Sequence, residues 1–306
     1  MDALMATHAF PEVPLELVDD FLQWGMTLDA SNGTAMSLAM VCKYTHSQAI
    51  KHLYGRILIN NFDTLRLLNA TFKAKPSLAN LTKTLIIDLI DDGSYHGPWV
   101  RQQLVDLFKH VTATPSTLEN LHVLCNSDRF FEYPYSRLDL KSLLCRNHSM
   151  PHGALSQPHL THLIHDDPDY LVRFEPARYP DLEHIATAVI LPWADVWTAY
   201  TAPAFADLVE QQGARLKCLV VVLAREIAAL ADGDLRTIIR GTPIRLITLT
   251  VPNCLGPIKK WTARDFFNLK AAMSQAHFDG SLWDPEQCNS DWIFRNVLPD
   301  GRPAHV

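Results

Sequence analysis

A short apolar pattern recurs along the middle of this 306-residue chain and limits the folds that it can adopt. Each copy has an aliphatic residue, two variable residues, a second aliphatic residue, one variable residue and a third, mostly apolar position. The alternation in the second half of each copy is typical of a strand. The copies recur at about 20 to 35 residues, which suits a repeat made of one strand and one return segment. They are LENLHV from Leu118, LKSLLC from Leu140, LTHLIH from Leu160, LEHIAT from Leu182, LKCLVV from Leu216 and IRLITL from Ile244.

The segments between the copies predict helices. GPWVRQQLVDLFKHV places Leu104, Leu107 and Phe108 on one helical face and Pro98 at the first helical position. LPWADVWTAY and REIAALADGDLRTIIRG also have helical periodicity. Strands that alternate with helices favour an α/β fold with a parallel sheet and outer helices.

A histidine-rich stretch, PHLTHLIHDDPDY at residues 158–170, contains the third copy. By itself it suggests a metal site or a hydrolase. The repeat changes this interpretation, because Leu160 and Leu163 take its core positions. Side chains alternate along a strand, so His162 and His165 are expected on opposite faces and cannot chelate one ion.

The catalytic motifs that a sequence can reveal are absent. The chain contains no GxSxG elbow, GxGxxG turn, phosphate loop ending in GK, or HExxH helix. We therefore expect a protein that is not an enzyme and needs no cofactor and no metal. A metal-dependent hydrolase built on residues 145–169 remains an alternative.

Composition and charge narrow the class of partner. The formal net charge is −6, and no run of lysine or arginine suggests a nucleic-acid or anionic membrane surface. The six cysteines are dispersed without a CxxC pair. The amino terminus lacks the basic region of a secretory signal, and no apolar run reaches the length of about 20 residues that spans a bilayer. We expect a cytoplasmic or nuclear protein, or one present in both compartments.

Residues 10–60 do not share the repeat. VPLELVDDFLQW predicts an amphipathic helix, with Pro14 in its first turn. After the polar loop TLDASNGT, the run AMSLAMVCKYTHSQAIKHLYGRILI predicts a second helical segment. Helices this short cannot bury two apolar faces by themselves, so a partner or the repeat region is expected to cover one of them.

The motifs in this block resemble an F-box. The family pattern matches Val13, Pro14, Glu16 and Leu17, and then Val41, Cys42, Lys43, Ala49, Leu53, Tyr54, Arg56 and Ile57. Two features depart from it: Thr45 replaces the usual tryptophan, and the connection over residues 25–34 is longer than usual. The repeats over about residues 80–255 resemble leucine-rich repeats in a degenerate form. The ninth position of the first copy, Asn126, is the asparagine of that family's pattern.

The two resemblances imply a domain organisation: an F-box-like helical module at 10–60, an irregular leucine-rich-repeat solenoid at 61–261 with a parallel sheet and outer helices, and a carboxy-terminal capping helix and tail at 262–306. They also imply a function. F-box proteins are adaptors that dock on a Skp-type linker and, through it, on a cullin ubiquitin ligase, while the rest of the chain binds a protein substrate. The alternative is a stand-alone repeat scaffold with a decayed F-box and no ligase.

The resemblance also indicates which residues bind partners, although some of them could instead hold the module together. The residues expected to contact the linker are Pro14, Leu17, Val18, Leu22, Val41, Cys42, Leu53 and Tyr54. Alternation along the predicted strands gives the residues expected on the open, substrate-binding face. These are His122, His162, Ile164 and Asp166.

Overall fold

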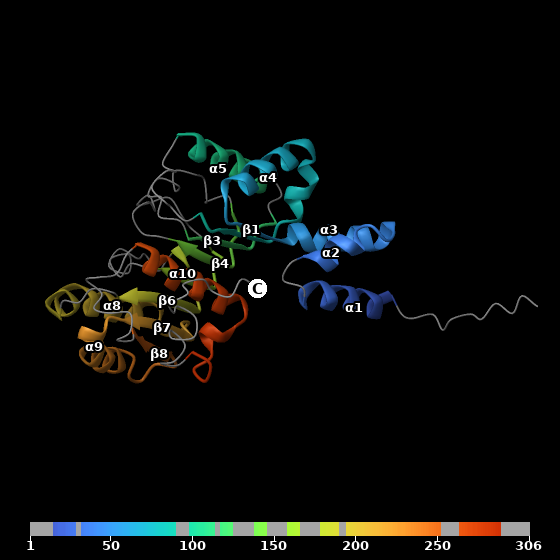
Figure 1. Ribbon diagram of the computed structural model, residues 1–306. Coiled ribbons are helices and arrows are strands. Elements are labelled where there is room, and N and C mark those ends of the chain that lie inside the picture. Colours follow the sequence, from blue (N-terminus) through green and yellow to red (C-terminus); the bar gives the residue numbers. More distant parts are fainter. Residues whose placement is uncertain are drawn as a thin grey trace, which may run out of the picture. The chain divides into compact units, whose positions relative to one another are not determined.

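The computed structural model describes residues 15–28, 32–89, 98–113, 117–124, 138–145, 158–165, 178–189, 194–251 and 263–288 (Figure 1). These residues form two compact units. Unit 1 is the described part of Met1–Gly55, and unit 2 is the described part of Arg56–Ala304. Asp166 and Pro14 lie outside the described residues.

Unit 1 consists of three helices, α1 (Leu15–Leu28), α2 (Gly33–Leu38) and α3 (Lys43–Gly55). Its core is small, because the helices are short. The buried side chains are Met26, Ala35 and Ala49, and the partly buried Leu22, Leu38, Ala39 and Leu53 pack against them. The run expected to be helical over residues 35–59 is divided between α2 and α3. Its last four residues, 56–59, form a strand with alternating burial.

Unit 2 contains one eight-stranded parallel sheet that is not closed into a barrel. The strands follow one another across the sheet in chain order, and every neighbouring pair is parallel. The prediction of an α/β fold with a parallel sheet is therefore confirmed. The strands are β1 (Arg56–Ile59), β2 (Thr84–Ile87), β3 (Asn120–Val123), β4 (Ser142–Cys145), β5 (His162–His165), β6 (His184–Val189), β7 (Cys218–Leu223) and β8 (Arg245–Thr250).

Five of the predicted copies form strands in a common register. Leu121 of β3 pairs with Leu143, which pairs with Leu163, and the series continues through Ile185 to Leu219. All five side chains are buried. The first aliphatic residue of each of these copies precedes its strand and is also buried, so the repeating pattern marks the interior of unit 2.

The last copy is shifted by one residue from its prediction. The sequence pattern makes Ile247 equivalent to Leu219, but the structure pairs Leu219 with Leu246 and Val220 with Ile247. A shift of one residue exchanges the faces of a strand. Ile247 is buried on the face opposite to the predicted one. The pattern misleads because both faces of β8 carry apolar residues.

Helices and turns connect the strands. The structure gives α4 (Phe62–Ala74), η1 (Pro76–Leu81), α5 (Pro98–Val111), α7 (Ala194–Val196), the π-helical turn η6 (Trp197–Thr201), α8 (Ala202–Gln212) and α9 (Arg225–Ile238). Within the described ranges, no helix combines the length and the apolar character needed to cross a membrane.

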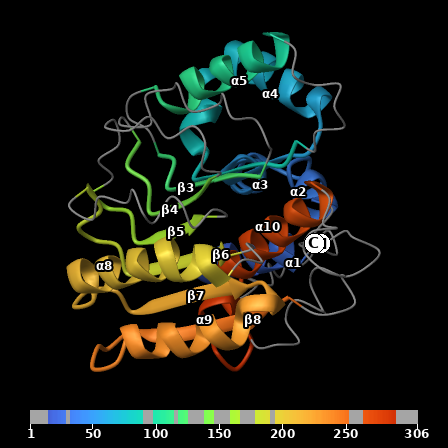
Figure 2. The same ribbon diagram turned by 90° about the vertical axis from the view of Figure 1, so that its left-hand side faces the viewer.

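The helix α9 packs on one face of the sheet. The Thr248 hydroxyl of β8 donates to Asp232 Oδ1 at 2.7 Å. The neighbouring Asp234 accepts from Trp197 Nε1 at 2.8 Å, which ties the π-helical turn to the same helix. Figure 2 shows α8 and α9 beside the strands β6 to β8. Trp197 is buried in the interior, whereas Tyr200 of the same segment is exposed.

The carboxy-terminal helix α10 (Ala263–Phe278), followed by the short turn η9 (Ser281–Trp283), lies on the other face. The sequence suggested that it closes the end of the last repeat. Its end lies elsewhere, because the Phe278 ring is 4.7 Å from the Arg56 guanidinium of β1 and 4.5 Å from the His122 ring of β3. Every residue from Asn268 to Ser274 is buried. The helix is therefore part of the interior.

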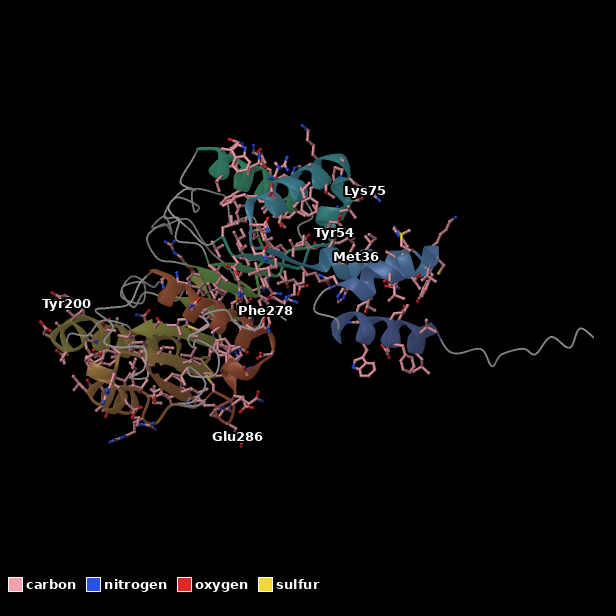
Figure 3. All side chains as sticks on the ribbon, in the orientation of Figure 1. Met36, Tyr54, Lys75, Tyr200, Phe278 and Glu286 are labelled. Carbon is pink, nitrogen blue, oxygen red and sulfur yellow. The ribbon has the colours of Figure 1, made fainter. Side chains whose placement is uncertain are left out.

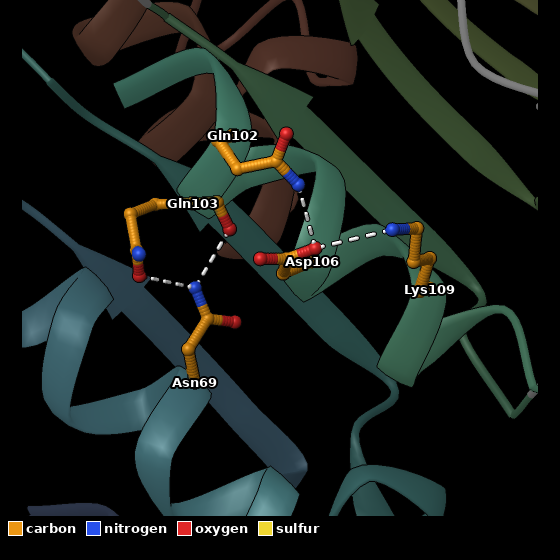
Figure 4. A network of polar contacts seen from close by, with 5 residues as sticks. All are labelled: Asn69, Gln102, Gln103, Asp106 and Lys109. Atoms are coloured by element: carbon orange, nitrogen blue, oxygen red, sulfur yellow. Dashed lines mark hydrogen bonds and ion pairs between the residues drawn. The ribbon is translucent and has the colours of Figure 1, made fainter. Parts of the chain in front are cut away.

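Asn69 links α4 to α5 (Figure 4). Its amide nitrogen donates to the backbone carbonyl of Gln103 at 2.7 Å and to Gln103 Oε1 at 2.9 Å. The Asn69 side chain is buried, so its amide N–H groups depend on Gln103 rather than on water for their hydrogen bonds. On the outer side of α5, Asp106 accepts from Gln102 and Lys109 in the exposed part of the network.

Asn69→Ala is expected to lower the free energy of unfolding of unit 2 by about 1–3 kcal/mol, because it removes two hydrogen bonds from a buried site. Chemical denaturation measures the change. Gln102→Ala is the matched control, and its effect is expected within about 0.5 kcal/mol because its bond is exposed. Equal effects of the two substitutions would contradict the role given to Asn69.

Candidate functional site

One face of the sheet carries a row of mostly polar residues that runs through all eight strands. Strand pairing places these residues side by side, and they are called the polar row below. The next row on the same face is mostly apolar and contains His122, Leu144 and Ile164. The polar row consists of Arg56, Thr84, Asn120, Ser142, His162, His184, Cys218 and Arg245.

At β3 this face is covered by α10. His122 Nδ1 lies 2.6 Å from the Ser274 hydroxyl of α10, and its Nε2 lies 3.1 Å from the Ser142 hydroxyl of β4. The His122 ring also packs against His277 and Phe278. Both ring nitrogens are therefore hydrogen-bonded, and the side chain is fully buried.

Two histidines of the polar row stack on each other beside the His122 contact. The rings of His162 and His184 lie 4.3 Å apart and 7° from parallel. His277 of α10 and Trp283 of η9 pack against His162 at 5.0 Å and 5.3 Å between ring centroids. Trp283 Nε1 donates to His277 Nδ1 at 3.1 Å. These residues form a layer between the sheet and the carboxy-terminal segment, called the histidine layer below: His122, His162, His184 and His277.

Burial keeps the histidine layer neutral. Desolvation, with smaller contributions from His184, His277 and Lys217, lowers the pKa of His162 to about 3. Desolvation and His184 lower the pKa of His277 to about 4. Burial also lowers the pKa of His184, and that of the fully buried His122 lies well below its ordinary value. At neutral pH the layer therefore carries no charge.

The predicted substrate face is thus partly covered in this structure. His122 and Ile164 are buried and His162 is half-buried, while Asp166 lies outside the described residues. The expectation of an open face at β3 and β5 differs from the structure because α10 and η9 fill it. His162 and His165 do belong to opposite faces, as alternation predicts. Among the described residues, no group of three or more His, Cys, Asp and Glu side chains is arranged to hold a metal ion.

A second candidate surface lies on unit 1. Leu17, Phe21 and Trp24 of α1 are exposed, with 64% of Trp24 accessible to solvent. They follow one helical face at spacings of four and three residues, whereas Leu22 and Met26 of the same helix pack into the core. The helix α1 therefore has two apolar faces. The sequence could have shown the exposed one from the spacing of its large side chains.

Unit 1 carries further exposed apolar residues near the start of α3. Met36 of α2, drawn in Figure 3, and Met40 and Val41 of the following turn are exposed, the last by 70%. Large apolar side chains left exposed on a small module are typical of a protein-binding surface. The apolar surface of unit 1 below refers to Leu17, Phe21, Trp24, Met36, Met40 and Val41.

The predicted linker-binding residues divide between this surface and the core of unit 1. Leu22 and Leu53 pack against the buried core, which is the structural role that the sequence left open for some of the set. Leu17, Val41 and Cys42 are exposed, and Val18 and Tyr54 are half-buried. Pro14 lies outside the described residues. Contact with a linker remains a prediction for all eight.

Thr45, which replaces the tryptophan of the F-box pattern, closes the first turn of α3. Its hydroxyl accepts from the backbone N–H of Cys42 at 3.1 Å and lies 3.4 Å from the Cys42 sulfur. This is half of a capping box, because a side chain in the first turn satisfies the backbone of the cap residue. Hydrogen bonds from Thr45, first from its side chain and then from its backbone, lower the pKa of the exposed Cys42 thiol.

Thr45→Val is expected to raise the pKa of Cys42, because it removes the hydroxyl that stabilises the thiolate. The pH dependence of iodoacetamide alkylation, followed on the Cys42 peptide by mass spectrometry, should shift to higher pH. Ser47→Ala, an exposed substitution on the same helix, should leave the profile unchanged. An unchanged profile in Thr45→Val would show that the hydroxyl does not stabilise this thiolate.

Comparison of the chain with protein-family models, with curated proteins and with solved structures found no match. The apolar surface of unit 1 is open, whereas the histidine layer is covered by the chain's own carboxy-terminal segment.

Proposed function

We propose that the chain is the substrate-recognition adaptor of a Skp–cullin–F-box ubiquitin ligase, working in the cytoplasm, the nucleus or both, and performing no bond chemistry itself. Unit 1 docks on a Skp-type linker, and unit 2 binds a protein substrate. The observation that carries the proposal is the apolar surface of unit 1. Six large side chains stay exposed on a module of three short helices.

Docking of unit 1 on a partner is supported by the apolar side chains that its small core leaves in water. Apolar area left in water contributes about 25 cal/mol per Å² when a partner covers it, and aromatic side chains carry the largest areas. Phe21 and Trp24 lie one helical turn apart, which is the spacing with which a helix enters an apolar groove. Val41 and Cys42, which match the F-box pattern, are also exposed on unit 1.

The architecture of unit 2 agrees with the repeat resemblance. Each strand pairs with the next one in the chain, and helices or turns return the chain between strands. Sequential parallel strands of this kind are what a leucine-rich-repeat solenoid requires. A repeat sheet of this kind offers a surface to a protein partner where other elements leave it uncovered.

The substrate surface is constrained by α10 and η9. These elements cover the polar row at its histidines, while Arg56 of β1 and Arg245 of β8 are exposed near its two ends. A substrate that uses the predicted residues His162 and Ile164 therefore has to displace the covering segment. A substrate that leaves the segment in place contacts the ends of the row.

The alternative is a stand-alone repeat scaffold without a ligase. Thr45 favours it, because this residue takes a capping role in place of an apolar contact of the F-box pattern. The two functions differ in a single measurable property. The adaptor binds a Skp-type linker, and the scaffold binds only the partner of unit 2.

The full chain is expected to co-purify with a Skp-type linker, and the double variant Phe21→Ala, Trp24→Ala is expected to weaken this binding by about a hundredfold or more. Truncation of central aromatic contacts typically has effects of this size. Titration calorimetry with the purified linker measures the change.

Tyr200→Ala is the matched control, because Tyr200 is an equally exposed aromatic residue of unit 2 (Figure 3). It should bind the linker like the unmodified chain. Absence of linker binding by the unmodified chain would favour the scaffold. Full binding by the double variant would exclude the apolar surface of unit 1 as the docking site.

A further inference from the structure

We propose that Ser281–Cys288 is an acid-released clasp: as the pH falls below about 6.5, protonation of His162 and His277 increasingly favours a state in which the Trp283–His277 hydrogen bond is broken, the segment has left the sheet, and the polar row at β5–β7 is accessible. The proposal concerns unit 2 alone and does not depend on ligase association. It rests on the geometry of the histidine layer beneath η9.

The hydrogen bond fixes the protonation state of His277. An indole N–H can only donate, so the Nδ1 atom that receives it at 3.1 Å must be an unprotonated acceptor. The proton of the neutral imidazole is then on Nε2. Protonation of Nδ1 turns the acceptor into a donor, and the bond between η9 and α10 is lost.

Protonation of the two histidines beneath Trp283, His162 and His184, also favours opening of the clasp. Trp283 packs against both members of the stacked pair, at 5.3 Å from the His162 ring and 5.2 Å from the His184 ring. The two imidazoles are 4.3 Å apart. Two protonated rings at this separation repel each other, and the repulsion is strong in a buried site.

The sign of the pH dependence follows from the lowered pKa values. In the closed state the pKa of His162 is about 3 and that of His277 about 4, whereas solvent-exposed imidazoles have a pKa near 6.5. The closed state is fully favoured above about pH 6.5. Between about pH 6.5 and pH 4 the open state binds protons that the closed state does not, so the equilibrium shifts toward opening as the pH falls.

Neighbouring charges are mixed in sign. Lys217 and Arg245 face His184 and lower its pKa, while Glu183 raises it. Lys217 and Glu183 form an ion pair of 2.7 Å. Asp279 faces His277 and raises its pKa. In the rest of the layer, Arg56 faces His122 and lowers its pKa. Desolvation is the largest cause at all four histidines, so opening is expected to release most of the shift.

Gly280 is the expected hinge at the start of the clasp, because glycine adopts a wide range of backbone angles. Gly280 has φ of +81°, and the space around its Cα is open. The helix before it is buried from Asn268 to Ser274, so α10 is expected to stay in place when Ser281–Cys288 moves.

Two buried thiols report on opening. Cys218 of the polar row and Cys288 of the clasp are free and buried, and burial raises their pKa values to about 11 and about 12. The neighbouring thiol of Cys218 and the carboxylate of Asp284 add to this rise at Cys288. Cys42 of unit 1 is exposed and serves as the internal standard.

The experiment measures thiol labelling of the full chain by 4,4′-dithiodipyridine, which reacts in acid, with each cysteine identified by peptide mass spectrometry. From pH 7.5 to pH 5.5, the labelling rates of Cys218 and Cys288 relative to Cys42 are expected to rise about a hundredfold, or about tenfold each for His162 and His277. The far-ultraviolet circular dichroism should stay constant. A constant rate ratio, or a rise that occurs only with loss of the circular dichroism signal, would overturn the proposal.

Variants separate the clasp from general acid unfolding. His277→Gln keeps an acceptor for Trp283 that does not titrate, so the rise should fall to about tenfold. His159→Gln changes an exposed histidine outside the layer and should behave like the unmodified chain. Trp283→Phe removes the donor and should increase labelling already at pH 7.5, which tests the clasp even if His277→Gln does not fold. An unmodified response in both His277→Gln and Trp283→Phe would refute the mechanism.

Discussion

The parallel, in-register pairing of eight strands is the constraint on which unit 2 depends. Because neighbouring strands keep the same register, each position of the repeat becomes a row of side chains across the whole sheet. Rows alternate between the faces. A polar residue at one position therefore has polar neighbours only if the same position is polar in the next copy, as it is at His162 and His184. The stacked pair of His162 and His184 is thus a product of the repeat rather than of local sequence.

Burial of both faces then decides the chemistry of these side chains. The helix α9 packs on one face at β7 and β8, and α10 packs on the other face between β1 and β5. Strands buried on both sides become continuously apolar, and β7 has this character from Cys218 to Leu223. The exceptions are the histidines, which stay neutral and pair with hydroxyls or with each other's rings. Imidazole suits such a site, because its neutral form has both a donor and an acceptor.

The sequence predicted the part of the fold in which the pattern is strong. Five copies became strands in the predicted register, but β1 and β2 were not counted among the copies. Their copies begin with Tyr54 and Thr82, which fill the first position with a residue that is not aliphatic. The position of α10 could not be predicted, because an apolar helix fits the end of a sheet as well as its face. Only the contacts of His122 with Ser274 of α10 and with Ser142 of the polar row, which exist once the sheet is assembled, distinguish the two.

Unit 1 shows the opposite relation between pattern and function. Its buried core is small, and the residues that fill it, such as Ala35 and Ala49, contribute little apolar area. Both aromatic residues of α1, Phe21 and Trp24, lie on its exposed face, where they add little to the stability of the module itself. Phe21 and Trp24 are therefore better explained by association than by folding. The two candidate surfaces therefore differ. Within the described part of unit 1, no element covers the apolar surface, whereas η9 already covers the histidines of the polar row.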